Sequence, residues 1–144
     1  MLVAMMSTER RFAALAVADR QVLVALADRI LHEVVDVELL GVPGPATMLV
    51  ELTESVRGQA FHLCEAVVSE ASVAVRGVRG DGLVLGSDTE RALAAAVCDA
   101  AAEAGLFVAE VEALVERAVG DHERDGARLA AAVAATRIEL EVLG

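Results

Sequence analysis

The feature that most constrains the fold is a long extended segment, residues 60–76, in a chain whose two ends have helical patterns. Along its second half, apolar side chains recur at every second position, as in a half-buried β-strand. One face of the segment carries Val67, Ser69, Ala71, Val73 and Val75. Around Cys64 and Glu65 the alternation falters, which predicts a bend or a bulge. The pattern therefore predicts a β-sheet in the middle of the chain.

Shorter strands are predicted on both sides of this segment. Residues 35–39 and 48–52 alternate in the same way, and a turn with the only two prolines, Pro43 and Pro45, separates them. These two strands are expected to form a hairpin. After the long segment, residues 79–82 read Arg-Gly-Asp-Gly, which favours a tight hairpin turn before a short strand at residues 83–86. We expect about four antiparallel strands.

Two helices are predicted before the sheet. Ser7 or Thr8 can cap the first, which runs to about residue 18 with Arg10 and Arg11 facing out. Asp19 caps the second, whose apolar stripe recurs at helical spacing. That stripe comprises Val22, Leu23, Leu26, Ala27 and Ile30.

Three helices are predicted after the sheet. Ser87 and Glu90 have the spacing of a capping box, and Gly105 ends that helix. A second covers residues 108–119, Gly120 stops it, and Asp121 opens the last. This order predicts an α+β fold with an N-terminal helical hairpin, an antiparallel sheet of about four strands and three C-terminal helices. We expect a single domain over residues 8–144, preceded by a disordered N-terminus at residues 1–7.

Charge and hydropathy limit the function. The 144 residues carry a net charge of −11, and all 12 basic residues are arginines. Nucleic-acid binding needs a basic patch that the chain lacks, and ATP would need a partner or a metal to supply positive charge. No run of apolar residues is long enough to span a membrane, so we expect a cytoplasmic protein. The mean hydropathy of +0.56 indicates either a composition rich in Ala and Val or a second face buried against a partner.

A His-x-Cys pair, His62 and Cys64, could hold a metal or pair as imidazole and thiolate, because residues two apart on a strand share a face. A metal site needs three or four ligands, and no CxxC is present, so no metal is expected. The alternative is a surface His62 and a Cys64 that fills a small pocket. Both Cys64 and Cys98 are expected to be free thiols.

Three carboxylates, Glu54, Glu65 and Glu70, lie in or near the same segment. Glu65 or Glu70 could act as acid or base with His62 if burial separated their pKa values. A solvated or partner-facing strand edge is the favoured interpretation, because the chain has 23 carboxylates. Where Asp88 begins a helix, capping is favoured over anion binding.

Several motifs carry a family resemblance over residues 11–105. They are Arg11-Phe12-Ala13-Ala14-Leu15-Ala16, Glu54-Ser55-Val56-x-Gly58-x-x-Phe61-His62-Leu63-x-Glu65, Val68-x-Glu70-Ala71, Gly80-x-Gly82 and Gly86-x-Asp88-x-Glu90-x-Ala92-Leu93. In order and spacing they resemble the G subunit (PhnG) of the bacterial carbon–phosphorus lyase core complex. Cys64 stands where the family usually has Gly, and Ser87 where Arg is common.

The resemblance implies an accessory subunit in phosphonate catabolism. It would support transfer of a phosphonate onto ribose C1 of ATP with release of adenine, and it would carry no catalytic residues. Its partners would be the nucleosidase-like, H-type and radical-SAM subunits, with no nucleic acid or membrane. The chain itself would bind no cofactor. The complex would use MgATP, and S-adenosylmethionine with an iron–sulfur cluster on another subunit.

The same extended segment supplies the candidate partner interface. Its residues are Phe61, His62, Leu63, Glu65, Val68 and Glu70. Two alternatives stay open: an enzyme that uses Glu65 or Glu70 with His62, and a small stand-alone ligand-binding or regulatory module without catalysis.

Overall fold

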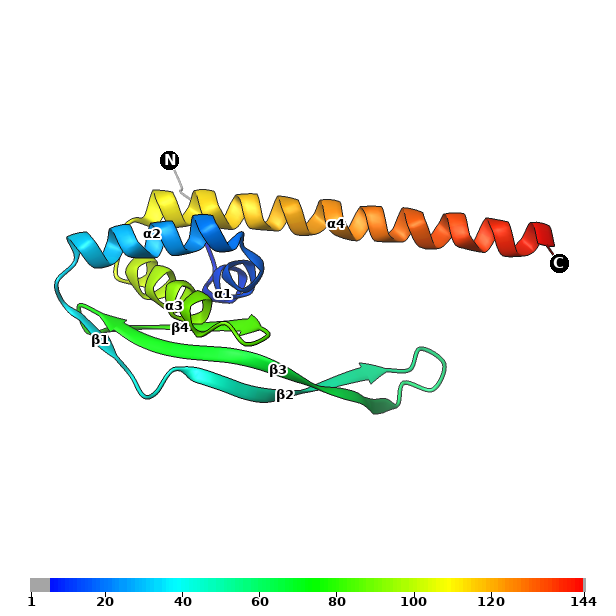
Figure 1. Cartoon of the computed structure of the whole chain (residues 1–144), viewed down its shortest axis with the longest axis horizontal. Helices are drawn as coiled ribbons and strands as arrows, with labels where there is room; N and C mark the ends of the chain where they lie inside the picture. The colour runs from blue at the N-terminus through cyan, green and yellow to red at the C-terminus, as the bar shows by residue number, and fades with distance from the viewer. Residues whose placement is uncertain (1–5, 144) are drawn as a thin grey trace.

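The computed structural model describes residues 6–143, apart from the side chains of residues 62–63 and 136–143. Its elements, in chain order, are α1 (Thr8–Val17), α2 (Arg20–Glu33), β1 (Val37–Leu39), β2 (Gly44–Thr53), β3 (Ala60–Val75), β4 (Val78–Leu85), α3 (Thr89–Glu103) and α4 (Val108–Leu143). The helices cover one face of an antiparallel sheet (Figure 1), which confirms the α+β class. The N-terminus expected to be disordered comprises residues 1–7. Residues 1–5 lie outside the described part, whereas Met6 packs against the core and Ser7 caps α1.

Strand β3 is the centre of the sheet. β1 and β2 both pair with one of its edges, end to end, and β4 pairs with the other edge. The predicted hairpin between the first two strands is therefore wrong. The chain between them bulges outward but does not reverse direction. It stays beside β3, since the Leu40 N–H still donates to the Ser72 carbonyl at 2.9 Å. Residues 40–43 lie opposite only Ala71 and Ser72.

The turn of the β3–β4 hairpin is Arg76-Gly77, and both residues have positive φ, of 50° and 77°. The turn predicted at residues 79–82 is wrong, because Gly80 and Gly82 lie inside β4. Both glycines let α3 pack close to the strand. A Cβ on Gly80 would lie 2.2 Å from the Ala100 nitrogen. Tertiary packing, and not a local turn, thus accounts for the glycine pair.

Three of the predicted helix ends are confirmed. Ser7 caps α1, Asp19 caps α2, and Gly105 follows the end of α3 with a φ of 78°. The cap of α3 is Asp88 instead of Ser87, because the Asp88 side chain accepts from the Arg91 N–H at 3.1 Å.

The predicted number of C-terminal helices is wrong, since the described residues form two and not three. Gly120 and Asp121 lie within the continuous helix α4. One glycine costs a helix only about 1 kcal/mol, which does not suffice to end it. Asp121 pairs with Arg124 one turn later and so supports the helix at this point.

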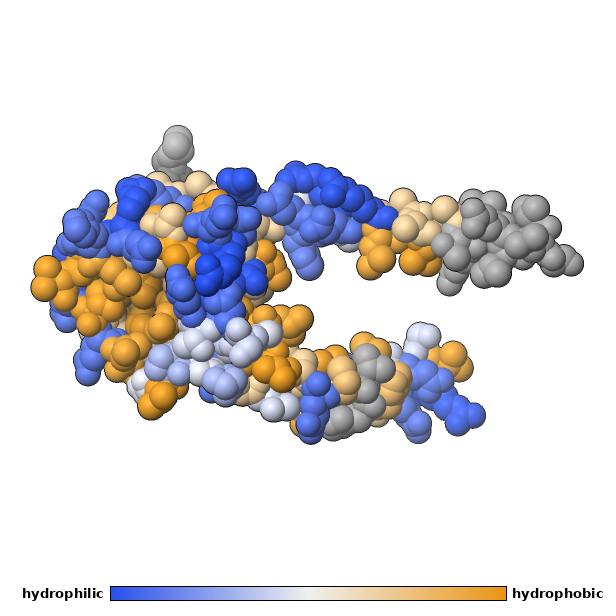
Figure 2. Space-filling view, in the orientation of Figure 1, coloured by the Kyte–Doolittle hydropathy of each residue, from blue (hydrophilic) through white to orange (hydrophobic). Residues whose placement is uncertain are grey.

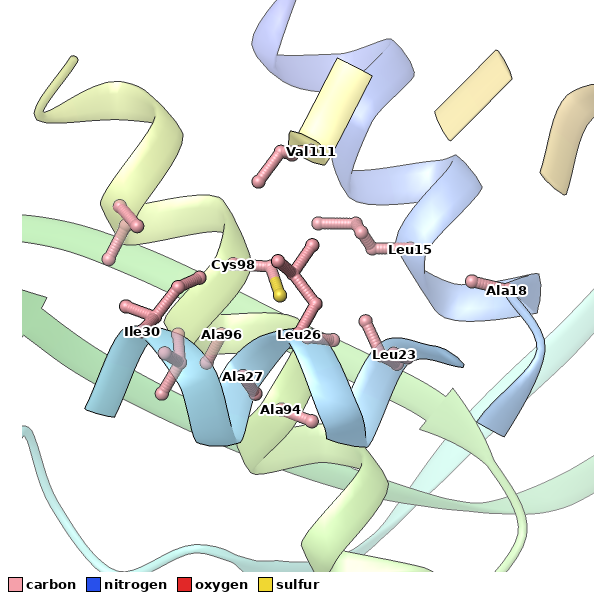
Figure 3. Close-up of a cluster of buried hydrophobic side chains, with 14 of the residues drawn as sticks. Leu15, Ala18, Leu23, Leu26, Ala27, Ile30, Ala94, Ala96, Cys98 and Val111 are labelled. Atoms are coloured by element: carbon pink, nitrogen blue, oxygen red, sulfur yellow. The ribbon is translucent and has the colours of Figure 1, made fainter. Parts of the chain in front are cut away.

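The core lies between the helices and the sheet and consists mainly of Ala, Val and Leu. α3 is the most deeply buried helix, with eight apolar residues in the cluster (Ala92, Ala94, Ala95, Ala96, Val97, Cys98, Ala100 and Ala101). Figure 3 shows Cys98 between side chains of α1, α2 and α4, among them Leu15, Ile30 and Val111. Small side chains on α3 let three other helices and the sheet approach it closely.

Two arms leave this core in the same direction (Figures 1 and 2). One is the far part of the β2–β3 hairpin, in which residues 51–61 are all exposed. The other is α4 beyond residue 121, whose described side chains are exposed from residue 122 to 135. These two segments contribute little to the chain's own core.

Candidate partner interface

Strand β3 carries the candidate interface residues, which run from the hairpin arm to the part of the strand that pairs with β4. Phe61 is 48% exposed, and Glu65 and Glu70 are exposed. Val68 is only 2% exposed, so it belongs to this chain's interior, and we remove it from the interface. The side chains of His62 and Leu63 lie outside the described residues.

A β-bulge interrupts the hairpin, as the faltering alternation predicts. Cys64 pairs with Val50 and His62 with Glu51, so the backbone of Leu63 has no opposite residue. A bulge of this kind bends a strand and increases its twist. It therefore separates the tip of the hairpin from the part that lies on the body.

One face of the hairpin is entirely apolar over six residues. Directly paired residues share a face, so the register places three residues of β2 beside three of β3. We call this the apolar hairpin face: Met48, Val50, Leu52, Phe61, Cys64 and Ala66. Met48, Leu52 and Phe61 are 39%, 45% and 48% exposed. A two-stranded ribbon is marginally stable alone, so such a face is typical of an interface.

The α4 arm also exposes apolar side chains. Leu129 and Val133 are 67% and 49% exposed and lie one turn apart, on the same side of the helix. Figure 2 shows apolar side chains on the arm where it faces the gap between the two arms. A helix without tertiary packing is weakly stable in water, which favours a partner along this arm.

Glu65 and Glu70, two of the residues considered for catalysis, are not brought together. Glu65 and Glu70 lie five positions apart on β3, roughly 17 Å along the strand, and point to opposite faces. Cys64 is exposed on the arm, while Cys98 lies buried in α3, where burial and then the charge of Asp99 raise its pKa to about 12. Within the described residues, no group of three potential ligands could hold a metal ion.

A buried ion pair is the feature that the sequence reasoning missed. Arg11 was predicted to face solvent, but it is only 4% exposed. Its Nε donates to Asp99 Oδ1 at 2.6 Å, and its Nη2 donates to Glu103 at 2.5 Å. The other Asp99 oxygen accepts from the Asp81 N–H at 3.0 Å. The pair therefore joins α1, α3 and β4, and the sequence signal for it was one Asp in the Ala-rich face of α3.

A second polar cluster fixes the start of α3. Arg20 Nε donates to the Asp88 carboxylate at 2.8 Å. The Ser69 hydroxyl accepts from the Asp88 N–H and donates to the Gly86 carbonyl, both at 2.8 Å. The carboxylate occupies the positive end of the helix, so this helix start caps itself and would repel an anion.

Acid should weaken the fold through these carboxylates. The hydrogen bond from Arg11 lowers the pKa of Glu103, and the one from Arg20 lowers that of Asp88. A lowered folded pKa gives stability that is present above the unfolded pKa, about 4, and is lost as the pH falls through the folded value. In urea titrations, the difference in unfolding free energy between wild type and Arg20→Gln should persist at pH 6 and shrink below about pH 4. A difference that grew in acid would contradict this.

Small size, an acidic surface and two uncovered apolar arms are typical of a subunit of a larger assembly. The family described as "Phosphonate metabolism protein PhnG" matches residues 7–144. A curated relative from Rhizobium meliloti (strain 1021), "Alpha-D-ribose 1-methylphosphonate 5-triphosphate synthase subunit PhnG", is 38% identical over 105 residues, which cover 71% of this chain and 67% of the relative. The chain belongs to the PhnG family. None of its helices, within the described residues, is both long and apolar enough to cross a membrane.

Proposed function

We propose that this chain is an accessory subunit of the carbon–phosphorus lyase core complex, which degrades organic phosphonates. The observation that carries the proposal is the pair of arms, whose apolar side chains its own core leaves exposed. The name of the 38% identical relative, a subunit of a ribose 1-methylphosphonate 5-triphosphate synthase, supports the same assignment.

The chemistry would belong to the partner subunits. In this proposal, they transfer a phosphonate onto ribose C1 of ATP and release adenine, and the present chain holds them in place. Its net charge of −11 makes it a poor host for MgATP by itself, so a nucleosidase-like partner would bind the nucleotide. H-type and radical-SAM subunits would complete the cytoplasmic complex, and the latter would carry the iron–sulfur cluster and S-adenosylmethionine.

A stand-alone ligand-binding module is the second candidate, and a hollow of about 300 Å³ between α2, α3 and β1 favours it. This size is at the lower end for small-molecule sites, and the lining is mostly apolar. Leu31 and Leu39 on its rim are 46% and 55% exposed, so the hollow is shallow at that side. The exposed arms have no role in this alternative, which is why we prefer the subunit.

Co-expression with the partner subunits tests the proposal. Size-exclusion chromatography with light scattering should show the wild-type chain in a stable complex. A charge on the apolar hairpin face, Phe61→Asp, should weaken assembly by about tenfold or more, because a half-exposed aromatic anchor would be lost. The matched control is Val35→Asp, which puts the same charge at a 97% exposed residue outside the arms and should assemble normally.

Two results bear against the proposal. A wild-type chain that elutes as a lone monomer, apart from the co-expressed partners, would overturn it. Equal assembly of Phe61→Asp and wild type would remove the hairpin arm from the interface. Thermal unfolding of each isolated variant shows whether the substitution has damaged the fold itself.

A further inference from the structure

Strand β3 is longer than its neighbour β4, which leaves one edge of the arm unpaired. β4 pairs with β3 from Val75 back to Val68, whereas β2 continues along the other edge as far as Ala60. Residues 60–67 thus have a partner strand on one side only, within the described part of the chain. Figure 1 shows β4 ending while β2 and β3 continue into the arm.

A backbone hydrogen bond at the end of β4 shows which backbone groups face this open edge. The Gly86 N–H donates to the Val67 carbonyl at 2.8 Å, and the chain then turns away at Gly86, with a φ of 90°. Alternate residues of an antiparallel strand point to the same edge, so Glu65 is the next residue whose N–H and C=O face outward there. Cys64 and Ala66 point the other way, towards β2.

Two other edges of the sheet are each protected at one position. At the start of the free edge of β2, the outward position is Pro45, which has no N–H to donate. On the free edge of β4, the outward N–H of Asp81 is already bonded to the Asp99 carboxylate of α3, at 3.0 Å. Among the described residues, the edge around Glu65 has neither a proline at an outward position nor an outward N–H that is already bonded. An unprotected strand edge is a template for one more strand.

We propose that an extended segment of a partner subunit adds to this edge as a β-strand, in line with β4. Its chemistry follows from the two faces of the arm. Every second side chain should be apolar, to extend the apolar hairpin face, and a Lys or Arg should stand opposite the exposed Glu65 on the other face.

The charge of the arm favours a strand from a different polypeptide over a strand from a second copy of this chain. Antiparallel pairing of two copies centred on Glu65 would place two carboxylates directly opposite each other, which destabilises a sheet. A basic strand gains from the same carboxylate and from the net charge of −11. The inference rests on the proposed function, because the strand would come from a subunit of that complex.

Proline substitution separates backbone pairing from side-chain contact. Glu65→Pro removes an N–H that faces the open edge and leaves the bonds to β2 in place, so the isolated variant should unfold at nearly the wild-type temperature. In the co-expressed complex, Glu65→Pro should lower assembly by about tenfold or more, while the matched control Glu65→Ala lowers it only a few-fold. Equal assembly of the Pro and Ala variants would overturn the inference.

Hydrogen exchange of the wild-type protein provides a second readout that needs no substitution. On assembly, the exchange rate of the Glu65 amide should fall to about one tenth of its value in the isolated chain, or lower. The exchange rates of the Cys64 and Ala66 amides, which are already bonded to β2, should change little. An assembled complex with unchanged exchange at Glu65, or with uniform slowing at all three amides, would overturn the added strand and leave the subunit assignment intact. Slowing in the isolated chain that increases with its concentration would identify a second copy instead. Failure of the wild type to assemble would overturn both proposals.

Discussion

Replacing Arg11 with Met is expected to lower the free energy of unfolding by about 3–5 kcal/mol, because it leaves a buried carboxylate without its partner. Arg11 and Asp99 are 4% and 4% exposed, and the two side chains meet at 2.6 Å. Among the described residues, Asp99 would keep only the Asp81 N–H as a hydrogen-bond partner. Methionine fills much of the arginine's volume, so the loss reports on the charge and its hydrogen bonds.

The neighbouring residue supplies the control. Arg10 pairs with Glu116 at 3.0 Å, but the two side chains are 51% and 68% exposed. Arg10→Met should therefore cost less than about 1 kcal/mol. Urea denaturation of both variants at pH 7 gives the comparison. Equal losses for Arg10→Met and Arg11→Met would show that the buried pair does not hold α1 on α3.

Adding one methyl group at Gly82 is expected to destabilise the protein by about 3 kcal/mol or more, at the upper end for overpacking a core. Its Cβ would lie 2.2 Å from the Ala92 carbonyl oxygen and 2.7 Å from the Ala96 nitrogen. Both atoms belong to the backbone of α3, so no side-chain rotation can relieve the contact. The helix would have to move away from β4.

Gly126→Ala is the matched control for Gly82→Ala. Gly126 lies within α4, and a Cβ there would meet no atom within 4 Å. The same substitution should therefore stabilise the protein by about 0.5–1 kcal/mol, through helix propensity. In chemical denaturation, the free energy of unfolding should fall for Gly82→Ala and rise for Gly126→Ala. A Gly82→Ala variant as stable as wild type would contradict the close packing of α3 on β4.

Local patterns were sufficient to predict the elements whose causes are local. Ser7 and Asp19 cap their helices because their side chains reach backbone N–H groups three residues later. The long strand and its bulge followed from alternation and from the point where it falters. The α+β class followed from the order of these elements.

Features that depend on contacts distant in sequence were not predictable in this way. Gly80 and Gly82 have the local pattern of a turn, and only the approach of α3 shows why they are glycines. Arg11 looks like a surface residue until Asp99, 88 positions later, lies beside it. Likewise, β1 joins β3 and not β2, because the long strand offers an edge for both.

The exposure of the candidate interface residues was predicted in part. The segment around Phe61 and Glu65 does lie on an exposed arm, but alternation alone did not reveal that Val68 is buried. The bulge at Leu63 shifts the pairing of the two strands, so the apolar face emerges only from the register. The α4 arm was missed because the helix was expected to break at Gly120.

Adenine release from ATP in the presence of a phosphonate is the most direct test of the subunit assignment. It should be measured for the co-purified partner subunits with and without this chain, and for this chain alone. We expect release from the full set, a loss of at least about tenfold when this chain is omitted, and none from the chain by itself. Release by the isolated chain, or undiminished release by partners that lack it, would contradict the assignment.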